Sequence, residues 1–166
     1  MTSPTFGQRS PFLVAGISAR TTNAREMDES TAAIGKLWGR WLGEQPWTGL
    51  PQRDEPSATI AVYGDYESDH RGAYTLTIGR LVESAGAVPR GLTLARVPGG
   101  DYAVFAGRGA IPDVVVSTWQ TVWEYFAPPQ ERERAYTADF EWYDPSDAQR
   151  LEIWIALRPV AKGSVR

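Results

Sequence analysis

A single carboxylate in the middle of an aromatic segment is the feature of this sequence that could carry chemistry. Residues 136–143 read Tyr-Thr-Ala-Asp-Phe-Glu-Trp-Tyr, which places Glu141 between Phe140 and Trp142. The segment has the composition of a strand, in which glutamate is uncommon and successive side chains point to opposite faces. Glu141 therefore shares a face with Tyr143, whereas Phe140 and Trp142 point to the other face.

The residues alone leave three roles open for Glu141. A buried Glu141 that stays ionised would attract a cationic ligand, and aromatic walls would add about 0.5–2 kcal/mol of cation–π attraction. A buried Glu141 whose pKa is raised would instead serve as a general acid. The third role is structural, with Glu141 on a solvent-facing strand surface and paired with an arginine.

The chain is rich in the aromatic residues that could surround such a charge. It contains seven Trp and seven Tyr among 166 residues, and we expect some of them to line a ligand site. The alternative for each is a place in the hydrophobic core, and for Trp154 a place on an exposed rim. The candidate ligand contacts besides Glu141 are Trp38, Tyr66, Trp119, Trp123, Tyr143 and Trp154.

The predicted helices and strands that position these residues occur in the same order in each half of the chain. Apolar residues with strand or helix spacing predict a strand, a helix and a hairpin in each half of the chain. The first set comprises a strand over 12–19, a helix over 30–42, capped by Asp28 or Ser30 and ended by Gly43, and strands over 58–66 and 73–82. The second comprises strand-like runs over 92–97 and 102–106, a helix over 112–126, and strands over 135–143 and 151–159.

This repeat predicts an α+β fold with tandem strand-helix-strand-strand modules. Its antiparallel sheet carries the helices on one side and a central pocket where the halves meet. In the repeat Gly64 corresponds to Glu141, which would leave open space beside the carboxylate. We expect a flexible tail over 1–10, one domain over 11–160 with halves over about 11–88 and 89–160, and a C-terminal tail over 161–166.

Composition excludes several classes of function. The formal net charge of −3 argues against direct nucleic-acid binding, which needs a basic face. No apolar run approaches the ~20 residues that span a bilayer, so we expect a cytoplasmic protein without membrane contact. The absence of cysteine and the single histidine exclude thiolate and multi-histidine metal sites, and we expect neither a metal nor a cofactor.

Three stretches of the chain resemble a known family. They are Val62-Tyr63-Gly64-Asp65-Tyr66-Glu67-Ser68-Asp69 with Gly72-Ala73-Tyr74-Thr75 and Ile78-Gly79; Val97-Pro98-Gly99-Gly100 before Tyr102-Ala103-Val104-Phe105; and Tyr136, Asp139-Phe140-Glu141 and Tyr143-Asp144. Their order and spacing, over about residues 12–159, resemble the GyrI-like small-molecule-binding domains. These are also the effector-binding domains of AraC-type and MerR-type transcription activators.

The resemblance implies a pocket lined by aromatic residues around a glutamate that binds hydrophobic, cationic drugs, and Glu141 matches that glutamate. Only residues 1–11 precede the region of resemblance, so we expect no DNA-binding module. The chain is then similar to stand-alone integron-cassette drug-binding proteins, with a transcription-related or other protein partner left open. Some stand-alone relatives are hydrolases that open cyclopropanes, so Glu141 as catalytic acid/base is the alternative. A third reading, inhibition of DNA gyrase by protein contact, finds no supporting feature in the residues.

Overall fold

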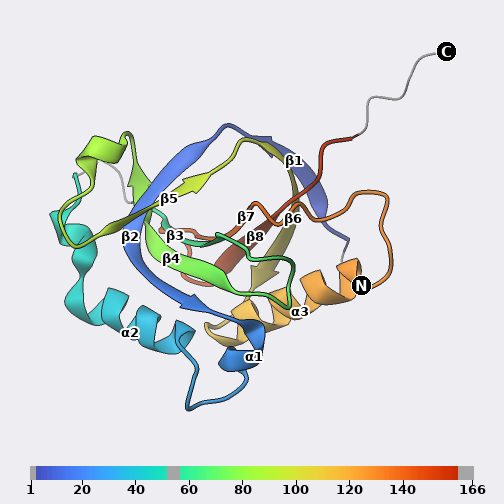
Figure 1. Ribbon diagram of the computed structural model, residues 1–166, viewed down its shortest axis with the longest axis horizontal. Helices are drawn as coiled ribbons and strands as arrows, with labels where there is room; N and C mark the ends of the chain where they lie inside the picture. Colours follow the sequence, from blue (N-terminus) through green and yellow to red (C-terminus); the bar gives the residue numbers. More distant parts are fainter. Residues whose placement is uncertain (1–2, 52–56, 161–166) are drawn as a thin grey trace.

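The computed structural model describes residues 3–51 and 57–160. Within these ranges eight strands form one antiparallel sheet, and the helices α2 and α3 lie along one side of it (Figure 1). No helix in this part of the chain is long and apolar enough to cross a membrane. The elements in chain order are β1 (Thr5–Arg9), β2 (Phe12–Thr21), α1 (Asn23–Glu26), α2 (Ile34–Glu44), η1 (Pro46–Gly49), β3 (Thr59–Gly64), β4 (Tyr74–Val82), η2 (Ala85–Ala87), β5 (Thr93–Val97), β6 (Gly100–Arg108), α3 (Asp113–Phe126), β7 (Ala138–Tyr143) and β8 (Arg150–Ala156).

The strand order β1-β6-β8-β7-β3-β4-β2-β5 has the symmetry of a duplicated unit. The two hairpins, β3–β4 and β7–β8, meet at the central pair β7–β3. The leading strand of each half crosses to the other half, because β1 pairs with β6 and β5 pairs with β2. The predicted α+β class and antiparallel sheet are confirmed. Both leading strands of the second half, β5 and β6, were expected as strand-like runs, whereas the first half has one strand more than predicted, β1.

The added strand corrects the expectation of a flexible tail over 1–10. Thr5–Arg9 form β1, which pairs in register with β6 from Thr5↔Val104 to Arg9↔Gly100. The chain then turns at once into β2, and Gly99 in the link from β5 to β6 packs closely against Pro11. These two links therefore cross on the sheet. The expected tail over 161–166 lies outside the described residues.

The two faces of the sheet bury different side chains. On one face α2 inserts Leu37 and Trp41 against the first half, and α3 inserts Val114 and Val122 against the second. These residues are spaced as one face of a helix requires. The opposite face buries a separate cluster that includes Val14, Ile60, Val62, Tyr102, Phe140 and, partly buried, Phe12, Trp142 and Trp154.

The ends of α2 differ from the sequence expectation. The helix begins at Ile34 rather than near Ser30, and the carboxylate of Glu26 accepts the backbone N–H groups of Ala33 and Ile34 at 2.9 and 3.2 Å. A carboxylate is favoured there because the first N–H groups of a helix lack partners within it. The expected cap Asp28 instead accepts from Ser30 in the preceding turn. The helix ends at Glu44, beyond Gly43, where Gln45 takes the left-handed conformation.

The expected correspondence between Gly64 and Glu141 is wrong, because the two residues lie on opposite faces of the sheet. Ala61 lies directly opposite Glu141 in the β3–β7 pair, so these two residues share a face. Gly64 is an odd number of residues from Ala61 and therefore faces the other way. A two-fold axis that keeps α2 and α3 on one side of the sheet cannot exchange Gly64 with Glu141.

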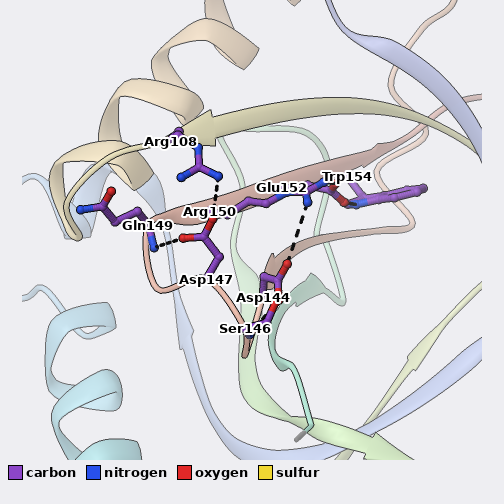
Figure 2. A network of polar contacts seen from close by, with 8 residues as sticks. All are labelled: Arg108, Asp144, Ser146, Asp147, Gln149, Arg150, Glu152 and Trp154. Carbon is purple, nitrogen blue, oxygen red and sulfur yellow. Dashed lines mark hydrogen bonds and ion pairs between the residues drawn. The ribbon is translucent and has the colours of Figure 1, made fainter.

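A polar turn fixes the end of β7. Figure 2 shows Asp144 with Ser146, and Asp147 with Gln149 and with Arg108 of β6. The Asp144 carboxylate accepts from Ser146 N and Oγ at 2.8 and 2.6 Å. Asp147 accepts from Arg108 at 2.6 Å, which ties the hairpin to the neighbouring strand. This turn holds Tyr143, one residue before it, at a defined position.

The close approach of β2 and β4 gives a stability test. Gly16 and Gly79 are paired, and a Cβ on Gly16 would lie 1.8 Å from the Ile78 carbonyl oxygen. We expect Gly16→Ala to lower the free energy of unfolding by about 1–3 kcal/mol, because backbone must shift. Gly64→Ala is the matched control, since a Cβ there meets nothing within 4 Å. Urea unfolding that ranks the two variants in the reverse order would contradict this packing.

Candidate functional site

Glu141 occupies the middle of the sheet, on the face covered by the helices. Its side chain is 0% exposed, and β7 lies between β3 and β8, so Ala61 and Ile153 flank it. The structural role on a solvent-facing surface is thereby excluded. A carboxylate in this position must find hydrogen-bond donors within the protein, because no water reaches it.

Three neutral side chains donate hydrogen bonds to Glu141. The Tyr63 hydroxyl and the Trp119 indole Nε1–H donate to Oε2, each at 2.7 Å, and the Tyr143 hydroxyl donates to Oε1 at 2.6 Å. Burial raises the pKa of both tyrosines, and the Glu141 charge raises it further, so both hydroxyls stay protonated donors.

Burial dominates the electrostatics of Glu141. Desolvation raises its pKa above the ordinary value of 4.5, and the hydrogen bonds from Tyr143, Trp119 and Tyr63 oppose that rise. In the described part of the chain no ion pair includes Glu141. Its carboxylate is therefore solvated by neutral donors and lacks a compensating positive charge.

A second buried carboxylate, two residues away, shows the opposite arrangement. Asp139 is 0% exposed and forms an ion pair with buried Arg134 at 2.7 Å. Its oxygens also accept from the Tyr66 hydroxyl at 2.7 Å and from the Ala156 backbone N–H at 2.8 Å. Asp139 is thus compensated by a cation within the fold, whereas Glu141 has only neutral donors among the described residues.

Aromatic rings from both helices fill the space above Glu141. Trp119 of α3 packs edge-on to Tyr63 at 5.0 Å, and Trp38 of α2 packs edge-on to Tyr143 at 5.1 Å. Trp123, one turn further along α3, lies 6.1 Å from Trp119 and is 47% exposed. The indoles therefore form a path of aromatic contacts from the surface to the carboxylate.

The candidate residues divide into three groups in the structure. Trp119 and Tyr143 bond to Glu141, and Trp38 and Trp123 pack against those two rings. Tyr66 bonds to Asp139 instead. Trp154 lies on the other face of the sheet, stacked on Phe140 at 5.6 Å, so the structure does not bring it to Glu141.

Sequence reasoning missed Tyr63, which donates directly to Glu141. Alternation along one strand identifies Tyr143, but the partner on β3 depends on the register between two hairpins that are far apart in sequence. Arg134, the partner of Asp139, was also missed, because it lies in a run of mixed charge over 131–134, a composition typical of solvated surface.

The raised pKa of Glu141 predicts how stability depends on pH. The cost of its buried charge is absent below the ordinary pKa of 4.5, grows as pH rises from that value to the raised pKa, and is constant above it. We expect Glu141→Gln to match the unmodified protein near pH 4, and to exceed its unfolding free energy increasingly as pH rises above 4.5, until Glu141 is fully ionised in the folded protein. A difference between the two proteins that is constant over this range, measured by urea unfolding, would contradict the assignment.

Asp139→Asn should behave in the opposite way. It removes the negative charge but leaves Arg134 buried without its partner, which typically costs about 3–5 kcal/mol. We expect a large loss of unfolding free energy at pH 7 by urea unfolding. A loss below about 1 kcal/mol would show that the Arg134–Asp139 pair does not stabilise the fold.

Comparisons with known proteins agree with this architecture. Residues 7–157 match the family described as Cass2, integron-associated effector binding protein. YobU of Bacillus subtilis (strain 168) is 32% identical over 149 residues, which cover 87% of this chain and 91% of YobU. The crystal structure of the integron cassette protein VCH_CASS2 from Vibrio cholerae superposes with a TM-score of 0.79 and 34% identity, covering 94% of this chain and 96% of that one.

A structure of SAV2435 bound to tetraphenylphosphonium has the same fold. It superposes with a TM-score of 0.77 at 18% identity and covers 98% of both chains. The family match, which spans most of the chain, and the similarity to VCH_CASS2 decide the assignment. This chain belongs to the integron-associated effector binding protein family, Cass2.

Proposed function

We propose that this protein binds hydrophobic aromatic cations, with Glu141 as the group that selects positive charge. The observation that carries the proposal is a fully buried carboxylate held by three neutral donors and by no cation in the described structure. The unfavourable free energy of desolvating this charge is already included in the folding of the protein. A cation that enters the site would therefore gain the full attraction of an unscreened negative charge.

The surroundings of Glu141 suit an aromatic ligand. The rings of Tyr63, Trp119 and Tyr143 bond to the carboxylate and Trp38 packs against Tyr143, and the faces of such rings attract cations. The Trp119 indole N–H already donates a hydrogen bond to Oε2 of Glu141. A ligand that approaches this oxygen must therefore take the place of the indole. Binding should therefore move Trp119 and change its fluorescence. The tetraphenylphosphonium held by SAV2435 is a cation of this class.

The wider role follows from the same chemistry. A site built from flat rings and one central charge fixes few directional contacts, which favours recognition of many aromatic cations. We propose a cytoplasmic effector- or drug-binding role. Any transcription-related partner would respond to a ligand-dependent shift of α2 and α3. No observation in the structure favours the hydrolase alternative over binding.

Tetraphenylphosphonium and tetraphenylborate test the proposal, because the two ions have nearly the same shape and opposite charge. We expect the protein to bind the cation and to reject the anion in titrations followed by tryptophan fluorescence. Glu141→Gln should weaken cation binding by tenfold or more, about 1.4 kcal/mol, and weaken the discrimination between the two ions.

Two further outcomes complete this test. Gly64→Ala, a change on the same sheet that touches neither ring nor charge, is the matched control and should bind like the unmodified protein. Equal affinity for both ions, or cation binding that survives Glu141→Gln unchanged, would sink the proposal. Mass spectrometry of the recovered ligand should show it chemically unaltered. Conversion of the ligand to a product would favour the hydrolase alternative instead.

A further inference from the structure

The opposite face of the sheet carries a second cluster of aromatic rings, and a positive charge lies within it. The guanidinium carbon of Arg9 lies 4.4 Å from the ring centre of Trp142 and 4.5 Å from that of Trp154. It lies 5.4 and 5.5 Å from the rings of Phe140 and Phe12. We call the four rings the Arg9 cage. All four distances are within the range of cation–π contact.

The cage is built by three strands, whereas its cation comes from a fourth. Trp142 and Phe140 come from β7, Trp154 from β8 and Phe12 from β2. Stacking of Phe140 on Trp154 at 5.6 Å and edge-on packing of Phe12 on Phe140 at 5.1 Å hold three of the rings without help from Arg9, and Trp142 packs against the same apolar cluster. Removal of the Arg9 side chain should therefore leave the rings in place.

The contacts of Arg9 resemble those of a bound ligand more than those of a structural ion pair. Among residues 3–51 and 57–160 its side chain forms no hydrogen bond and no ion pair. Burial lowers its pKa, and the nearby charge of Glu152 opposes that effect. Glu152 accepts a hydrogen bond from the Trp154 indole at 3.0 Å and is also paired with Arg150 at 3.1 Å, so the carboxylate beside the rings already has a cationic partner.

The side chain of Arg9 also lies at a position from which it can leave the cage. Arg9 is the last residue of β1, which is an edge strand with a single partner, β6. Phe12, Trp142 and Trp154 are each partly exposed, so the cage reaches the surface. Edge strands and chain ends open at lower free energy than central strands.

We propose that the Arg9 cage is a second cation-binding site, which Arg9 closes and which accepts a quaternary ammonium group in place of the guanidinium. Both groups are broad cations that bind ring faces well, and aromatic cages with a nearby carboxylate suit a trimethylammonium group. The site is distinct from Glu141, because it lies on the other face of the sheet and uses none of the same side chains.

Choline and 3,3-dimethyl-1-butanol test the proposal, since the alcohol has the same shape as choline without the charge. We expect Arg9→Ala to bind choline at least tenfold more tightly than the unmodified protein, and at least tenfold more tightly than it binds the alcohol. The NMR signals of the Trp142 and Trp154 indole N–H groups should shift during the titration.

Control variants separate this site from the first. Arg9→Lys retains a cation and should bind choline as weakly as the unmodified protein, and Arg9→Gln tests the site with a longer neutral side chain if Arg9→Ala loses β1. Adding Trp142→Ala to Arg9→Ala should abolish choline binding, whereas adding Glu141→Gln should not change it. The proposal fails if neither neutral variant binds choline more tightly than the unmodified protein, if the alcohol binds equally well, or if Glu141→Gln removes binding.

Discussion

The burial of a carboxylate that forms no ion pair with any residue the structure describes is the constraint around which this fold is organised. Glu141 lies in the central strand pair with no exposed surface, where an ion without donors could not persist. The fold supplies three donors from three elements, β3, α3 and β7. All three are neutral and two are tyrosine hydroxyls, so the groups that stabilise the charge would also form the walls of the site proposed for an aromatic cation.

The duplicated architecture explains how these groups converge. The central pair β7–β3 joins the two halves, so a side chain on β7 meets residues from both. The duplication is broken at Glu141, because its cross-strand neighbour is Ala61 and the site holds one carboxylate rather than two. Two carboxylates on directly opposite residues of this strand pair would repel each other and raise each other's pKa. The charge of Asp139, two residues from Glu141, is compensated by the ion pair with Arg134.

The sequence predicts much of this fold and about half of the site, for identifiable reasons. Strand alternation places Glu141 and Tyr143 on one face, and helical spacing brings Trp119 to the core. Tyr63 and Arg134 depend on pairings between segments distant in the chain, which periodicity does not reveal. β1 contains a single large apolar residue, Phe6, and composition alone does not identify it. Its signal lies in the repeat, because the strand over 93–97 before β6 implies a counterpart before β2.

The ionisation of Glu141, with and without a cation, tests the central claim most directly. A ¹³C NMR titration of its carboxyl carbon would follow the protonation of this group alone. In the free protein the account predicts a pKa above the ordinary value of 4.5. In the complex with tetraphenylphosphonium it predicts a lower pKa, because the ligand's charge stabilises the ionised form. An ordinary pKa in the free protein, or one that the cation leaves unchanged, would contradict the account.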